Sequence, residues 1–258
     1  MHNIDRPQFI VRMMRQNFPH VGATIPAAFT AALDKLTETY DITGQVVDPA
    51  DPTWRRDLSA AVIAAVASGS DIADDKTVRE LLVRKQLSEA GVPGMVRDHV
   101  ELLRRQVIVE HSDDLLDELH RAFVVAAETI EEARTKIPAL DLSSREGLSS
   151  VTATHMTLWG RAYDAAERIR TLVPLWAMIA MLTHPNIGVQ NDMRPLVIAD
   201  LTADQLDRIP TPRDLDSAVL GAVLHGFPLS LATPDEFRER CERVREEWQE
   251  RDKAHSHA

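Results

Sequence analysis

The sequence predicts an all-α protein built on a long antiparallel helical hairpin, with shorter helices flanking it. Apolar residues in 92–137 recur at steps of three and four, which indicates one face of an α-helix rather than a strand. A second stretch with the same period, 144–172, follows after a short link that contains Pro138. Glycine is scarce, at 10 residues, and aromatic residues make up 5%, which is atypical of an all-β chain.

The N-terminal part, residues 1–54, is expected to hold two helices and a loop. Phe9 and Met13 lie on the apolar side of a short first helix. This helix either packs on the rest of the chain or docks on another molecule, so both residues are candidate contacts with a partner. A second helix is expected over 25–40, and the turn-forming residues of 41–54 then separate this part from the main body.

Residues 55–200 are expected to form the helical body. The alanine-rich segment 55–68 predicts a buried helix that ends at Gly69. A further helix is expected up to residue 90, with Asp74 or Asp75 as its N-cap.

This helix pair allows a helix-turn-helix interpretation, in which residues 55–90 bind DNA. Acidic side chains offset the basic ones along this stretch, and the whole chain carries a net charge of −11. Nucleic-acid binding is therefore not expected, because its electrostatic footprint is missing.

The first arm of the hairpin leaves two alternatives open. As one helix, 92–137 would be about 65 Å long. However, His111 stands where the apolar stripe should continue, and Ser112 or Asp113 could cap a new helix. A helix of this length cannot bury its apolar face alone, so the second arm is expected to cover it. That arm begins at a capping-box pattern, Ser143 with Glu146.

The C-terminal part, residues 201–258, carries three helix starts. They are a capping box at Thr202 with Gln205, a Thr-Pro start at 211–212, and a second capping box at Thr233 with Glu236. The last helix is expected to run to about residue 251.

This last helix has a narrow apolar stripe, with charged residues on its other sides. Such a stripe suits either a coiled-coil contact with another chain or docking on the chain's own body. Its members are the main candidate interface residues: Phe237, Cys241, Val244 and Trp248.

One cluster resembles a metal site in its spacing. Asp117 and His120 are three residues apart and share a helix face, as in helical-bundle metal sites. His111 lies on the same arm and His155 on the other, so these four are the low-ranking metal candidates. A di-iron bundle needs two Glu-x-x-His motifs and two further glutamates, and the chain has one aspartate version, so no cofactor is expected.

Composition limits the remaining classes. A single cysteine excludes an internal disulfide framework and a cysteine-rich zinc site. The uncharged stretch 171–191 has an apolar part of only about ten residues, so no membrane span is expected. The chain is expected to lie in the cytoplasm or within an assembled particle.

The function predicted from these features is that of a structural, assembly or adaptor protein rather than an enzyme. Such a protein, of the kind found in viral and other particles, would act through helical interfaces with protein partners or with itself. The alternatives are a helical-bundle metalloprotein or enzyme, and a DNA-binding regulator that uses residues 55–90.

Overall fold

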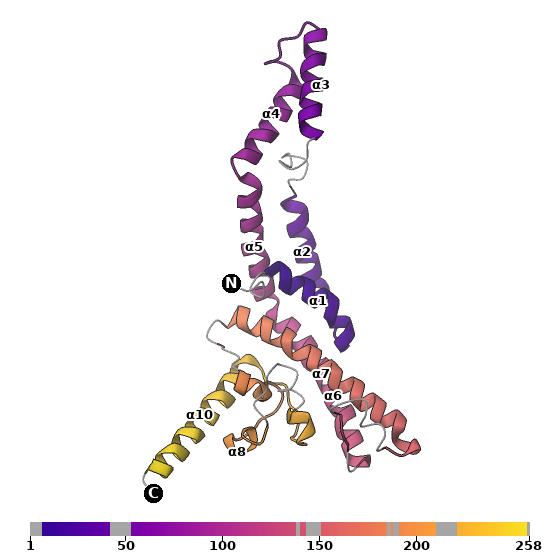
Figure 1. The fold of residues 1–258 in the computed structure, drawn as a ribbon, viewed down its shortest axis with the longest axis vertical. Coiled ribbons are helices and arrows are strands. Elements are labelled where there is room, and N and C mark those ends of the chain that lie inside the picture. The colour runs from indigo at the N-terminus through magenta and orange to yellow at the C-terminus, as the bar shows by residue number, and fades with distance from the viewer. Residues whose placement is uncertain are drawn as a thin grey trace. The chain divides into compact units, whose positions relative to one another are not determined.

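The computed structural model describes most of the chain, namely residues 7–41, 53–137, 140–142, 151–184, 187, 191–209 and 221–256. Every regular element among these residues is helical, so the predicted all-α class is confirmed (Figure 1). The chain divides into two compact units, one comprising Met1–Phe29 and Ile108–Ala258 and the other Thr30–Val107. The predicted boundaries after residues 54 and 200 stay predictions.

The larger unit is built on α6 (Ser112–Lys136) and α7 (Met156–Thr183), which lie side by side (Figure 1). The two helices run in opposite directions, since Glu132 near the end of α6 lies 3.7 Å from Arg161 near the start of α7. Both helices bury the apolar stripes that their sequences predict; on α6 the buried residues include Leu115, Leu119, Phe123, Ala126, Ile130 and Ala133.

The structure does not confirm that 92–137 and 144–172 form a single two-helix hairpin. Its first arm consists of two helices, α5 (Val92–Glu110) and α6, with His111 between them. Most of α5 belongs to the Thr30–Val107 unit. The break that the sequence left open at His111 is therefore present, and α7 packs along α6.

The break has a local cause in the side chains around it. His111 has φ −108° and ψ 13°, outside the α-helical region, and Ser112 Oγ donates to the carbonyl of Val109 at 2.8 Å. Neither Ser112 nor Asp113 caps α6, which begins without a side-chain cap. The second arm's expected start, Ser143 with Glu146, lies outside the described residues.

The first helix, α1 (Pro7–Val21), packs on α7 and α6 of its own unit. It ends at Gly22, whose φ of +82° suits a residue without a side chain. The N–H of Ala23 donates back to the carbonyl of Phe18 at 2.9 Å and closes the helix end. The face that α1 buries comprises Ile10, Val11, Met14, Phe18 and Val21.

The smaller unit contains most of α2 (Ala27–Thr39), together with α3 (Thr53–Ala67), α4 (Lys76–Glu89) and most of α5. α3 and α4 pack on each other. The predicted helix ends are confirmed, because Gly69 has φ +70° after α3 and Asp75 accepts a hydrogen bond from an N–H of α4. Where the start of α3 meets the end of α4, Lys85 Nζ lies 5.5 Å from the ring centroid of Trp54.

The C-terminal elements are η4 (Asn191–Val197), α8 (Ala203–Leu206) and α10 (Pro234–Ser256). α10 packs on both η4 and α8. Both predicted capping boxes that fall in this part form, and the predicted Thr-Pro start at 211–212 lies outside the described residues. None of the described helices combines the length and apolar composition that crossing a membrane requires.

The α6 core gives a first prediction. Ile130 is fully buried, so Ile130→Ala is expected to lower the free energy of unfolding by about 2–5 kcal/mol, through lost contacts and a cavity. Val125 on the same helix is 58% exposed, so Val125→Ala should change it by about 0.5 kcal/mol or less. Urea unfolding followed by tryptophan fluorescence measures both, and equal effects would contradict the assignment of the buried face.

Candidate functional site

The predicted interface stripe of α10 is covered by the chain itself. Phe237, Cys241 and Val244 are buried, and the ring of Phe237 meets that of Trp176 on α7 edge-on at 5.5 Å. The fourth member, Trp248, is half-buried and donates its indole N–H to Asp207 at 3.2 Å. The stripe of α10 therefore packs on the chain's own body, which is the second of the two predicted alternatives. Its three buried side chains are consequently not available to another chain.

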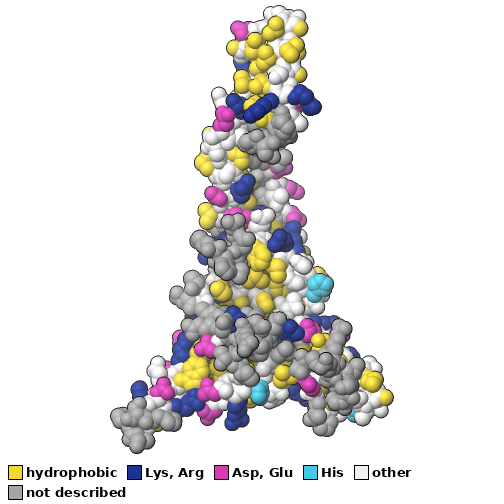
Figure 2. Space-filling model, viewed as in Figure 1, with side chains coloured by type: hydrophobic (Ala, Val, Ile, Leu, Met, Phe, Trp, Pro, Cys, Tyr) yellow, Lys and Arg dark blue, Asp and Glu magenta, His cyan; other side chains and the backbone are white. Residues whose placement is uncertain are grey.

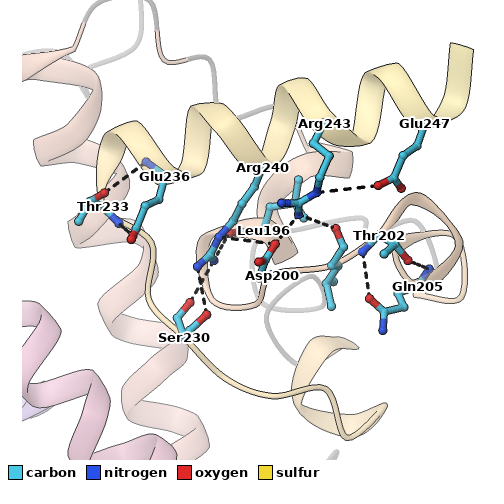
Figure 3. Close-up of polar contacts among 11 residues, drawn as sticks. Leu196, Asp200, Thr202, Gln205, Ser230, Thr233, Glu236, Arg240, Arg243 and Glu247 are labelled. Atoms are coloured by element: carbon cyan, nitrogen blue, oxygen red, sulfur yellow. Dashed lines mark hydrogen bonds and ion pairs between the residues drawn. The ribbon is translucent and has the colours of Figure 1, made fainter.

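A buried arginine fixes α10 in this position (Figure 3). The guanidinium of Arg240, whose residue is 8% exposed, donates to the carbonyl of Leu196 at 2.9 Å. It also donates to the carbonyl and the hydroxyl of Ser230, each at 3.1 Å. Burial lowers the pKa of Arg240, and Asp200 nearby opposes this shift. The side chain thus satisfies acceptors on two segments that α10 covers.

Two further arginines of α10 bind the segment around α8. Arg243 pairs with Asp200 and donates to the carbonyl of Leu201 at 3.2 Å. Arg251 pairs with Asp204 and Asp207, each at 2.7 Å. These contacts and the apolar stripe together make α10 part of the larger unit's framework.

The candidate residues on α1 remain at its edge. Phe9 and Met13 are half-buried, and the Arg12 guanidinium lies 5.4 Å from the Phe9 ring centroid. Met13 lines a groove of about 260 Å³ between α1 and α7, with Pro174 and Met178 on the other side. α1 therefore packs on the chain itself, which is the first of the two alternatives predicted for it.

The four metal candidates are not brought together. Asp117 and His120 line one groove, whereas the ring of His111 meets that of Phe29 edge-on at 5.9 Å. His155 lies at the start of α7, and α7 reaches the groove at Trp176, roughly 30 Å further along the helix axis. Within the described part of the chain, no group of three or more His, Cys, Asp or Glu side chains could hold a metal ion.

The groove that contains Asp117 and His120 has a volume of about 460 Å³. His184, from just after α7, and Asp235, from the first turn of α10, also line it. Sequence reasoning missed these two residues because three separate elements supply the lining, and no spacing along the chain relates them.

The helix predicted to be buried over 55–68 is mostly exposed. Residues 60–67 read AAVIAAVA, and Ala65 is the buried residue of α3. Ile63 is 68% exposed and Val66 60% exposed. The prediction of a buried helix is therefore wrong, because α4 covers one side of α3 and the other sides are apolar as well.

The exposed residues of α3 form one surface. Helical spacing places five of them on one side, opposite Ala65, which faces α4. We call this surface the outer face of α3; it comprises Ser59, Ala60, Ile63, Val66 and Ala67, all exposed. Figure 2 shows hydrophobic side chains at the surface over α3 and α4.

The described part of the smaller unit has few buried side chains. Among the residues of this unit that the structure describes, 30–41 and 53–107, the buried apolar ones are Leu33, Leu36, Ala65 and Val78. The predicted inward stripe of α5 in this unit is only half-buried; it comprises Val96, Val100, Leu103 and Val107. A unit with so small a core leaves apolar surface that another molecule can cover.

Most of the basic residues of α3 and α4 are engaged with acidic neighbours. Arg79 pairs with Asp74, and Lys85 lies 3.4 Å from Glu89 while also contacting the Trp54 ring. To contact phosphates these side chains would have to exchange partners, so the DNA-binding alternative gains no support from their arrangement.

Comparisons with known proteins do not place the chain in a family. No protein-family model, curated protein or solved structure matches it.

The contacts of Arg240 give a second prediction. Arg240→Ala leaves the carbonyls of Leu196 and Ser230 without this donor, and we expect the free energy of unfolding to fall by about 2–4 kcal/mol. Arg238 lies on the same helix with an exposed side chain paired to Asp235, so Arg238→Ala should cost about 0.5 kcal/mol or less. Chemical unfolding of the two variants tests this. Similar losses in the free energy of unfolding would show that the buried contacts of Arg240 do not stabilise the packing of α10.

The only cysteine gives a third prediction. Burial raises the pKa of the Cys241 thiol to about 11, so at pH 8 only about 0.1% of it is thiolate. Ellman's reagent at pH 8 is expected to react at least about tenfold faster in urea than with the folded chain. Because the unfolded thiol ionises near pH 8.5, the free energy of unfolding should fall between about pH 8.5 and 11 relative to that of Cys241→Ala. Rapid labelling of the folded chain would show that Cys241 is exposed.

Proposed function

We propose that the protein is a non-enzymatic assembly or adaptor protein that binds a protein partner through the outer face of α3. The observation that carries this proposal is the combination of sequence and exposure in one helix. Residues 60–67 contain no polar side chain, yet Ile63 and Val66 are more than half exposed. A helical segment that is apolar on all sides is normally buried, so residues 60–67 are suited to burial by another molecule.

The energetics favour covering this face. Burying an isoleucine or valine side chain contributes about 1.5–3 kcal/mol relative to leaving it in water. Ile63 and Val66 are neighbours at helical spacing, and the alanines beside them allow a second helix to approach closely. A short amphipathic or apolar helix that packs on another helix is a common form of protein recognition.

The proposed interface is not the one that sequence spacing first suggested. The stripe of α10 packs on its own unit, and Phe9 and Met13 lie at the edge of an internal contact. The outer face of α3 has no such cover among the described residues, as the exposures of Ile63 and Val66 indicate.

A photo-crosslinking amino acid at position 63 tests the proposal in cells that express the full chain. We expect a discrete crosslinked protein species with the reactive group at Ile63. The same group at Val125, which is exposed on α6, is the matched control and should give no such species. Absence of any crosslink from position 63, at a level of folded protein equal to the control, would overturn the interface assignment.

A further inference from the structure

The α3–α4 pair has no net charge, unlike the chain as a whole. The net charge of the chain is −11. Residues 53–90 contain six basic and six acidic side chains: Arg55, Arg56, Lys76, Arg79, Arg84 and Lys85 against Asp57, Asp71, Asp74, Asp75, Glu80 and Glu89. The net negative charge therefore lies entirely outside this pair of helices.

The charges within the pair are also separated along its length. The contact of Lys85 with Trp54 brings the start of α3 and the end of α4 together, and we call this end the base. The base, residues 53–57 and 84–90, has four basic and two acidic side chains, a net charge of +2. The opposite end, residues 68–80, which we call the tip, has four acidic and two basic side chains, a net charge of −2. The segments between them carry no charged side chain.

From this arrangement we infer that the partner on the outer face of α3 is a second copy of the same chain, packed antiparallel about a two-fold axis. This inference rests on the proposed interface and names its occupant. In an antiparallel pair the basic base of each copy lies beside the acidic tip of the other, so the charges attract at both ends. A parallel pair would place base against base and tip against tip.

The residues of the outer face suit such a two-fold contact. A two-fold contact uses the same surface on both copies, and here Ile63 lies midway between Ser59 and Ala67. Small residues on both sides of Ile63 permit the close helix approach of about 8–10 Å between axes. Arg56 lies at the base end of the same face, with its side chain 78% exposed, where the tip of the other copy would pass.

The expected dimer is weak. α3 is about 22 Å long, so the contact falls at the small end of protein interfaces, where micromolar dissociation constants are typical. Two copies that met through the segment Ile108–Ala258 of the larger unit would bring together surfaces that carry most of the chain's net negative charge.

Sedimentation velocity of the full chain, over micromolar to near-millimolar concentrations, tests the second copy. We expect a reversible monomer–dimer equilibrium that Ile63→Glu weakens at least about tenfold, since it places two carboxylates at the centre of the contact. Val125→Glu, on α6, should leave the dissociation constant unchanged. A chain that stays monomeric throughout, or a dimer indifferent to Ile63→Glu, overturns the inference.

A charge exchange tests the antiparallel orientation. Arg56→Glu makes the base less basic, and Asp74→Lys makes the tip less acidic; both side chains are more than three-quarters exposed. Each variant alone is expected to dimerise about threefold or more weakly than the unchanged chain, whereas an equal mixture should form mixed dimers more readily than either variant pairs with itself. No preference for mixed dimers overturns the antiparallel arrangement.

The crosslinking and sedimentation experiments together distinguish failure of the interface proposal from failure of the second-copy inference. A crosslink from position 63 to a different protein, with a monomeric purified chain, overturns the second copy and leaves the interface proposal standing. A crosslinked species with the mass of two copies supports both. No crosslink and no dimer overturn both.

Discussion

Burial of the apolar stripes shared by α6 and α7 is the interaction on which the larger unit depends. α1 packs on this pair through Ile10, Met14 and Phe18, and the first turns of α10 reach it through the contact of Phe237 with Trp176. Each fully buried large apolar side chain contributes about 1.5–3 kcal/mol, against about 1–2 kcal/mol of backbone entropy for every residue that is ordered. A paired helical core is therefore needed before the shorter C-terminal elements can be held by polar contacts such as those of Arg240.

The helices of the smaller unit, in contrast, depend mainly on local contacts rather than on a shared buried core. These helices are well defined locally, by the Asp75 cap and by the positive-φ glycines at 69 and 91, but they bury few side chains of their own. Local caps and ion pairs contribute about 1 kcal/mol or less each, which defines helix ends and cannot replace a core. The same chain thus combines one unit whose apolar stripes are buried internally with another in which α3 leaves large apolar side chains exposed.

The sequence predicts features whose causes are local. Helical period, the capping boxes at Thr202 and Thr233, and the cap at Asp75 follow from neighbouring residues, and the structure has all of them. Burial depends on distant residues, so the exposure of α3 and the internal docking of α10 could not be read from spacing. Glutamates four residues from the α10 arginines suggest pairs within the helix, yet Arg251 binds aspartates more than forty positions earlier. The groove residues His184 and Asp235 were missed for the same reason.

The separation of charge in this chain has a consequence for the size of any assembly. A two-fold contact would cover the outer face of α3 on both copies, and the net negative charge of the chain lies outside residues 53–90. Such a pair carries twice the net negative charge of one chain and therefore repels a third copy at low ionic strength. The net charge of the chain would then oppose the addition of further copies to the pair.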